Sequence, residues 1–312
     1  MTLIPSIDSL ADSARELKSS ELTQLSGLLD DERDELRSRW AEIDTARRCQ
    51  ILSMLIELAD NNCELDFGAV YDAALADPDA AVREQAVSGL WESGDRRTIP
   101  KLTGLLSDDA DERVRAAAAL VLGHFAVLAA ADKLVERDVE RIYRSLMAPL
   151  ANEDEPLTVR RRALEAVAAF ATPEVPGLIH RAYESDEPKL RQSALCAMGR
   201  TGDPTWLPTI HGEMRSGDPA MRYEAANAAR EVGEEESVPY LADLLEDTDV
   251  EVALAAVLAL GMIGGAKAKK LLRGISAGDG ESSVIEAASE ALRLAEMDEK
   301  NLSFPKVSDR LG

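Results

Sequence analysis

Histidines, cysteines and paired carboxylates are the residues with which this chain could do chemistry, and none of them falls into a recognised catalytic spacing. The histidines stand far apart, at His124, His180 and His211. The cysteines share no CxxC-type spacing, at Cys49, Cys63 and Cys196, which favours reduced thiols over a zinc site or a disulfide framework. No HExxH, Walker-type or Gly-x-Ser-x-Gly motif occurs. We therefore expect a protein that is not an enzyme and that carries neither a metal nor a cofactor.

The charge and apolar content limit the kinds of partner. The 312 residues include 58 acidic and 35 basic side chains, for a net charge of −23. An acidic chain is repelled by nucleic acid and by anionic membranes, so we expect neither as a partner. The segment MTLIPSIDSL does not resemble a signal peptide, and no run of 18 apolar residues occurs. These features predict a cytoplasmic protein without membrane insertion.

A sequence repeat of about 31 residues is the strongest signal for the fold. Its anchors are apolar residues, most of them followed by arginine: Val82, Val114, Val159, Leu190, Met221, Val252 and Val284. The spacings are 32, 45, 31, 31, 31 and 32 residues. A fixed period of this size is the signature of a solenoid.

Each repeat is punctuated as a pair of helices. Three residues before the anchor lies an acid that can cap a helix: Asp79, Asp111, Glu187, Asp218, Asp249 or Glu281. Twelve residues after the anchor lies a glycine suited to a helix C-terminus in four repeats: Gly94, Gly202, Gly233 and Gly264. A second helix then starts at an apolar-Pro pair such as Ile99-Pro100. We expect an all-α fold, an α-solenoid with a core of Ala, Leu and Val.

The repeats resemble the short HEAT-like repeats of the phycobilisome-lyase type. The best matches are DPDAAVREQAVSGLWESGDRRTIPKLTGLL (77–106) and DPAMRYEAANAAREVGEEESVPYLADLL (218–245). The resemblance spans roughly residues 45 to 296 and implies a superhelix of stacked antiparallel helix pairs. It implies little about function, because such repeats serve many roles.

Three regions are expected along the chain. Residues 1–44 match the repeat poorly and are predicted to form an N-terminal helical cap, with helices in SIDSLADSARELK and SSELTQLSGLL. Residues 45–297 form the solenoid, with an insertion near 127–138 that we expect to lengthen an inter-helix connection. Residues 298–312 have no periodicity and are expected to form a flexible tail.

The leading functional hypothesis is a non-enzymatic scaffold or adaptor that binds a macromolecular partner through the concave face of the solenoid. The alternative is an enzyme subunit or chaperone-like lyase acting on a cofactor-bearing protein, as the phycobilin lyases do. Deoxyhypusine hydroxylases, which are also built of HEAT-like repeats, hold two irons with His-Glu pairs, and this chain has none. A DNA glycosylase built of HEAT-like repeats would be basic, with aromatic residues lining its groove. This chain is strongly acidic and has only three tryptophans, so we do not expect that activity.

Arginines follow five of the anchors: Arg83, Arg115, Arg160, Arg191 and Arg222. The series breaks at Ala253. We interpret these arginines as structural, each pairing with the acid four residues earlier and with an acid of the neighbouring repeat.

The partner surface is predicted from the second helix of each pair, which we expect to line the concave side. Its core positions are Ile99, Leu102 and Leu106; Val139, Ile142 and Leu146; Val175, Leu178 and Ala182; Leu207 and Ile210; Val238, Leu241 and Leu245; Ala268, Leu271 and Ile275. The positions opposite are Arg97, Lys101, Gly104; Arg137, Arg141, Arg144; Pro173, Gly177, His180; Thr205, Thr209, Gly212; Glu236, Tyr240, Asp243; Ala266, Lys270 and Arg273. Seven of these are Lys or Arg and two are acidic.

This excess of basic residues predicts a groove for an acidic or phosphorylated segment of another protein. The candidate partner-binding residues are Arg97, Lys101, Arg137, Arg141, Arg144, His180, Tyr240, Lys270 and Arg273. The alternative is that the row is simply a solvated helix face, which is polar in any protein.

Overall fold

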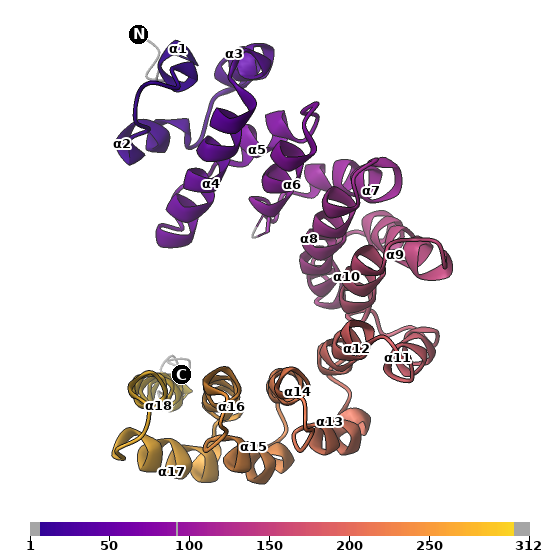
Figure 1. The fold of residues 1–312 in the computed structure, drawn as a ribbon, viewed down its shortest axis with the longest axis vertical. Coiled ribbons are helices and arrows are strands. Elements are labelled where there is room, and N and C mark those ends of the chain that lie inside the picture. The colour runs from indigo at the N-terminus through magenta and orange to yellow at the C-terminus, as the bar shows by residue number, and fades with distance from the viewer. Residues whose placement is uncertain (1–6, 92, 303–312) are drawn as a thin grey trace, which may run out of the picture. The chain divides into compact units, whose positions relative to one another are not determined.

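The computed structural model describes residues 7–91 and 93–302, and every regular element in that part of the chain is a helix. Two compact units divide the chain, unit 1 up to Phe170 and unit 2 from Ala171 (Figure 1). Each unit consists of stacked antiparallel helix pairs, as in an α-solenoid. The predicted fold class is therefore confirmed.

The helices alternate along the chain between two layers, which we call the first helices and the second helices of the pairs. The helices of unit 1 are α1 (Ile7–Ala11), α2 (Ser19–Leu22), α3 (Asp30–Arg39), α4 (Thr45–Asn61), α5 (Gly68–Ala74), α6 (Ala80–Ser88), α7 (Ile99–Asp108), α8 (Glu112–Ala130), α9 (Glu136–Ala151) and α10 (Leu157–Val167). The helices of unit 2 are α11 (Val175–Tyr183), α12 (Pro188–Arg200), α13 (Leu207–Glu213), α14 (Pro219–Val232), α15 (Val238–Leu244), α16 (Val250–Ile263), α17 (Gly265–Ser276) and α18 (Ser282–Leu302).

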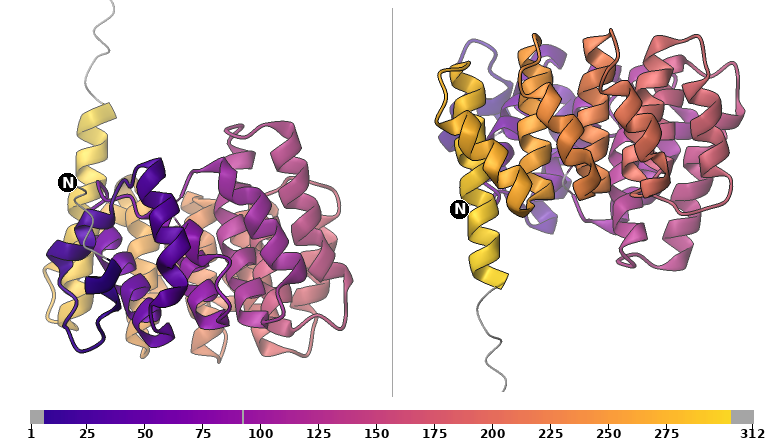
Figure 2. Two further views of the ribbon diagram at one scale, coloured as in Figure 1. Left: turned by 90° about the horizontal axis from the view of Figure 1, so that it is seen from above. Right: turned by 90° about the horizontal axis from the view of Figure 1, so that it is seen from below.

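The first helices pack directly on one another within each unit. In unit 1 they are α4, α6, α8 and α10, and in unit 2 they are α12, α14, α16 and α18. In unit 2 the second helices contact one another far less, and in unit 1 α7 and α9 contact each other less than α8 and α10 do. Figure 2 shows the helices of each unit running side by side, with the end of α18 projecting beyond its neighbours.

The close packing of the first helices depends on small residues. A Cβ on Gly199 would lie 2.6 Å from Cα of Ala228, and one on Gly261 would lie 2.9 Å from Cβ of Ala291. Because the more closely spaced layer must be the inner one, the first helices form the inner layer of each unit. Our expectation that the second helices line the concave side was therefore wrong, since it overlooked these glycine–alanine approaches.

The predicted helix starts are largely confirmed. The carboxylates of Asp79, Asp111, Asp218 and Asp249 each accept a hydrogen bond from a backbone amide of the first turn, whereas Glu187 makes no such bond. An aspartate oxygen reaches these amides directly, and the longer glutamate side chain is a poorer cap.

The predicted helix ends are confirmed at three glycines and wrong at one. Gly202, Gly233 and Gly264 have positive φ values of 63°, 78° and 69°, which glycine adopts most readily at a helix end. Gly264 combines its positive φ with a ψ of −150° and is therefore extended rather than left-handed helical. Gly94 does not adopt a positive φ of this kind, because α6 already ends at Ser88.

The insertion lengthens helices rather than a connection. Helices α8 and α9 have 19 and 16 residues, and only residues 131–135 separate them. The alanine- and leucine-rich segment simply continues α8, because it contains no helix breaker, until Asp132 adopts a left-handed φ of 56°. The expectation of a longer inter-helix connection was therefore wrong.

Both ends of the chain also differ from the prediction. The expected N-terminal helices are short, five residues in α1 and four in α2, and the longer helix of this region is α3. Helix α18 continues to Leu302, so residues 298–302 are helical rather than part of a tail. Residues 303–312 lie outside the described part of the chain.

The core positions of the second helices were predicted correctly in most pairs. In α9 Val139 is half-buried and its neighbour Asp138 is buried instead. In α11 the buried residue is Ile179 rather than Leu178, and in α17 it is Leu272 rather than Leu271 or Ile275. In α11 and in α17 two large apolar residues follow one another, Leu178–Ile179 and Leu271–Leu272. The apolar pattern alone could not decide which residue of each pair faces the core.

Helix α8 is long and apolar enough to cross a membrane, judged by length and composition alone. Somewhat more than half of it is buried inside unit 1, as expected for a core helix. Val114, Ala118 and Leu122 are fully buried on one side of it, which confirms the predicted register.

Candidate partner-binding surfaces

Three arginines join successive repeats in the same way, and we call them the arginine ladder: Arg83, Arg115 and Arg222. The guanidinium of Arg83 donates to both carboxylate oxygens of Asp109, at 2.7 and 2.8 Å, and that of Arg222 donates to both oxygens of Asp247, at 2.6 and 2.7 Å. Arg115 donates from Nε to Glu155 at 2.8 Å. Each ladder arginine therefore bonds an acid of the next repeat.

Each ladder arginine also donates from Nη1 to the carbonyl oxygen six residues earlier in the chain. The distances are 2.7 Å for Arg83, 2.8 Å for Arg115 and 3.0 Å for Arg222. The side chains thus connect the loop before one first helix to the loop before the next. This geometry supports the structural interpretation for three of the five arginines of the series. Arg191 lies 3.7 Å from Glu213 instead, and Arg160 forms no ladder bond among the described residues.

The pairing within a helix that we expected is not formed. Asp79 and Asp218 use their carboxylates to cap helices, and the arginines four residues later bond to the next repeat instead. The sequence did not reveal which acid of the next repeat the arginine bonds. It is the acid two residues before the capping aspartate of that repeat, Asp109 before Asp111 and Asp247 before Asp249. Sequence reasoning also missed Arg48, whose Nη1 lies 2.8 Å from a buried carboxylate oxygen of Asp77, because the anchor position before Arg48 is not apolar.

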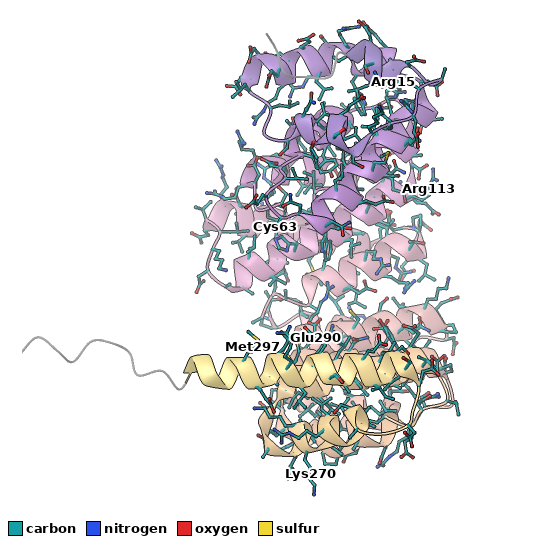
Figure 3. All side chains as sticks on the ribbon, turned by 90° about the vertical axis from the view of Figure 1, so that its left-hand side faces the viewer. Arg15, Cys63, Arg113, Lys270, Glu290 and Met297 are labelled. Atoms are coloured by element: carbon teal, nitrogen blue, oxygen red, sulfur yellow. The ribbon has the colours of Figure 1, made fainter. Side chains whose placement is uncertain are left out.

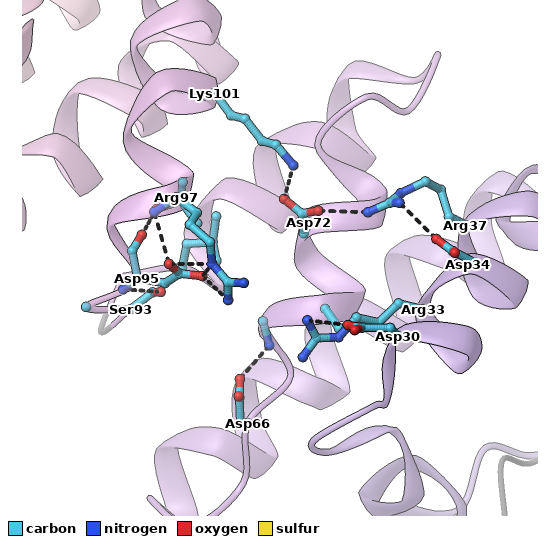
Figure 4. Close-up of a pocket in the computed structure, with 15 residues that line it drawn as sticks. Asp30, Arg33, Asp34, Arg37, Asp66, Asp72, Ser93, Asp95, Arg97 and Lys101 are labelled. Carbon is cyan, nitrogen blue, oxygen red and sulfur yellow. Dashed lines mark hydrogen bonds and ion pairs between the residues drawn. The ribbon is translucent and has the colours of Figure 1, made fainter.

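A charged hollow of about 680 Å³ lies in unit 1, between α3, α5 and the start of α7 (Figure 4). Two of the predicted partner-binding residues, Arg97 and Lys101, line it. Arg33 and Arg37 of α3 line it as well, and sequence reasoning had not selected them because they precede the repeats.

Every cation of this charged hollow already has a carboxylate neighbour. Lys101 and Arg37 both contact Asp72, and Arg97 donates to Asp95 at 3.0 Å. The hydrogen bond from Arg97 holds the pKa of Asp95 below its usual value. An anionic ligand would have to displace these carboxylates. We therefore interpret the charged side chains of the hollow as ion pairs that hold α3, α5 and the start of α7 together, rather than as an anion site.

Three predicted residues lie on α9 and are exposed: Arg137, Arg141 and Arg144. Arg144 pairs with Glu140, and Nε of Arg137 lies 3.7 Å from Asp138. Arg141 has no ion-pair partner within residues 7–91 and 93–302. The cationic charge of α9 is thus only partly neutralised.

In unit 2 the predicted residues take part in separate contacts. The ring of His180 lies 4.7 Å from that of Trp206. Tyr240 stacks on His211 at 3.9 Å, and the guanidinium of Arg215 lies over the Tyr240 ring at 5.2 Å. Burial lowers the pKa of His211, whose Nε2 lies 3.0 Å from Oγ of Ser237.

The two basic residues of α17 differ in their surroundings. Arg273 donates to Glu296 at 2.6 Å. Lys270 is exposed, and Figure 3 shows it extending away from α18. All 18 positions predicted to oppose the core are exposed or half-buried.

The inner layer of unit 2 carries a cluster of exposed apolar side chains, which we call the apolar face: Leu258, Met262, Leu294 and Met297. Their exposed fractions are 47%, 74%, 49% and 46%. They lie on the adjacent helices α16 and α18, and Figure 3 shows Met297 on α18. Sequence reasoning missed this surface because it assigned the inner layer to the second helices.

The described residues contain no group of three or more His, Cys, Asp or Glu side chains placed to hold a metal ion. Each histidine instead has an aromatic ring as its neighbour.

Comparison with known proteins identifies the repeat family. The HEAT repeats family matches residues 69–148 and 207–293, more than half of the chain. No curated protein sequence matches the chain.

Several solved structures are similar in fold. The complex of CpcE and CpcF of phycocyanin lyase from Nostoc sp. has a TM-score of 0.53 at 20% identity, covering 77% of this chain and 90% of that one. Human deoxyhypusine hydroxylase has a TM-score of 0.38 at 20% identity, covering 86% and 96%. Kap121p bound to Pho4p has a TM-score of 0.47 at 15% identity, covering 92% and 36%. These similarities concern the fold alone, and the family match shows that the chain belongs to the HEAT repeat proteins.

Proposed function

We propose that this chain is a non-enzymatic HEAT-repeat scaffold or adaptor that binds another protein through the inner layer of unit 2, in the cytoplasm. The observation that carries the proposal is the apolar face. Four large apolar side chains on two adjacent helices, one of them 74% exposed, gain free energy when a partner covers them. Methionines suit such a surface because their flexible side chains adapt to the partner.

The test introduces charge into the apolar face. The double substitution Met262→Glu and Leu294→Glu should abolish partner capture, measured by crosslinking and mass spectrometry of native pull-downs, without changing the melting temperature. A matched control places two glutamates in the outer layer, at the exposed positions Thr205, in the 3-10 turn just before α13, and Ala266 on α17. Equal capture by the wild type and both variants would contradict the proposal. Loss of capture in the control alone would assign binding to the second helices.

A second candidate partner is an acidic or phosphorylated protein segment, bound by the second helices of unit 1. The exposed Arg141, which has no ion-pair partner among the described residues, supports this reading together with its neighbours Arg137 and Arg144. The substitutions Arg141→Glu and Arg144→Glu should then weaken capture of the partner and reduce its dependence on salt. Unchanged capture would exclude this surface.

The scaffold proposal also competes with an enzyme subunit or lyase acting on a cofactor-bearing protein. The purified protein distinguishes the two. A visible absorption band, or a stoichiometric metal found by elemental analysis, would overturn the scaffold proposal.

A further inference from the structure

The arginine ladder forms where one repeat supplies an arginine after its anchor and the next repeat supplies an acid. Arg160 and Arg191 make no ladder bonds among the described residues, and Ser185 and Ser216 stand where the acid of the next repeat would be.

One repeat shows the opposite case, in which the arginine is missing. In three repeats the residue after the anchor is an arginine that bonds a carbonyl oxygen six residues earlier and an acid of the next repeat. In the repeat of α16 this residue is Ala253. The backbone around Ala253 is otherwise that of its neighbours, with Asp249 capping α16 as Asp218 caps α14.

A cleft of about 370 Å³ lies at the place where the missing guanidinium would be. Ala253 lines it, together with Asp247, Glu281, Val250 and Val284. Asp247 is the residue six positions before Ala253, so it carries the carbonyl group that a ladder arginine would bond. None of the described residues that line the cleft is a lysine or an arginine.

The acid that would complete this ladder position is also present in the sequence. Asp279 lies five residues before the anchor Val284, as Asp109 lies five before Val114 and Asp247 five before Val252. Asp279 is exposed and has no ion-pair partner within residues 7–91 and 93–302. Asp279 does not itself line the cleft, but its chain neighbours Gly278 and Gly280 do. The cleft therefore combines apolar walls, which suit the methylene groups of an arginine, with acceptors for its guanidinium in Asp247 and Glu281.

We propose that this cleft, which we call the arginine cleft, receives an arginine side chain from the partner protein, which thereby completes the ladder in trans. The proposal rests on the proposed function, since the partner supplies the arginine. Its support is the precedent within the chain, where the same surroundings hold Arg83, Arg115 and Arg222. The carboxylates around the cleft repel anions and favour a cation of this kind.

The N-termini of α16 and α18 border the cleft, and a helix N-terminus disfavours a nearby cation. The ladder arginines occupy the same position relative to α6, α8 and α14. Their charge-assisted hydrogen bonds to carboxylates thus outweigh the helix dipole. A lysine cannot replace arginine here, because its ammonium group cannot bond two carboxylate oxygens and a carbonyl in the planar geometry observed.

The experiment measures binding of Nα-acetyl-arginine amide to the full chain by NMR, with Nα-acetyl-lysine amide as the matched probe. The arginine probe should shift the amide signals of residues 274–281 saturably and bind at least fivefold more tightly than the lysine probe. Ala253→Arg should fill the cleft from within, raise the melting temperature and weaken the arginine probe at least tenfold. Ala266→Arg adds the same charge at an exposed position of α17 that does not line the cleft, and it should leave probe binding unchanged.

The outcomes separate this inference from the proposed function. Equal binding of the two probes, or unchanged binding to Ala253→Arg, would overturn the arginine cleft even if the apolar face still captures a partner. If Ala253→Arg does not fold, Asp279→Asn should weaken the arginine probe severalfold, and no effect would contradict the inference. If Arg310→Ala binds the arginine probe more tightly than the wild type does, the chain's own C-terminal segment occupies the arginine cleft. That result would also overturn the proposal that a partner's arginine occupies it. Probe binding without any partner capture would support the cleft and count against the scaffold.

Discussion

Replacing Arg222 by methionine tests whether the arginine ladder stabilises the stack. Methionine keeps much of the side-chain volume and removes the charge. The substitution removes the two hydrogen bonds that Arg222 donates to Asp247, at 2.6 and 2.7 Å, and the one that it donates to the carbonyl of Ser216, at 3.0 Å. The side chains of Arg222 and Asp247 are only 15% and 8% exposed, so the substitution leaves a carboxylate in a largely buried site.

The expected cost follows from these contacts. Breaking a buried ion pair by removing one partner costs about 3–5 kcal/mol. Asp247 keeps one hydrogen bond, from the amide of Asp249 at 2.9 Å, and some access to water. We therefore expect Arg222→Met to lower the free energy of unfolding of unit 2 by about 2–3 kcal/mol, which is at or just below the lower limit of that range.

Urea denaturation followed by circular dichroism measures this cost. The control is Arg293→Met, because Arg293 pairs with Glu290 on the surface, where both side chains are more than half exposed, and water and salt screen such a pair so that it contributes little to stability. The double variant Arg222→Met, Asp247→Asn should be more stable than the two single costs predict, because it buries no unpaired charge. The reasoning is refuted if Arg222→Met costs no more than the control, or if the two single costs simply add.

Further predictions concern packing, pH and thiol chemistry. Ala118→Leu overpacks the fully buried side of α8 and should cost about 1–3 kcal/mol; an unchanged melting curve would contradict the register. The hydrogen bonds from Arg222 lower the pKa of Asp247, so this pair stabilises the fold above the carboxyl's unfolded pKa of about 3.9. Its contribution should disappear as the pH falls through the lower folded value, and Asp247→Asn should flatten the acid limb of a stability–pH curve. Cys63 is exposed, whereas burial raises the pKa of the half-buried Cys49, so iodoacetamide at pH 8 should modify Cys63 first, as peptide mass spectrometry will show.

Features set by residues close together in sequence were predictable. The capping aspartates, the glycine at 233 and the start of α15 at Val238 follow from local rules, because each acts within one helical turn. The buried side of α8 followed from its apolar period.

Features set by the neighbouring repeat were not predictable in the same way. The partner of Arg83 lies 26 residues away in a loop, and the acid four residues before it was the nearer candidate. The inner layer was assigned wrongly because it depends on how closely Gly199 approaches Ala228, which no single repeat reveals. The apolar face was missed for that reason.

The unequal packing of the two layers has a mechanical consequence for unit 2. At Gly199 and Gly261 no side chain separates the neighbouring first helices, so these helices cannot move closer together. The second helices of unit 2 touch one another little, so changing their spacing breaks few contacts. The softest deformation of unit 2 is therefore a change in the spacing of its second helices while the first helices keep theirs.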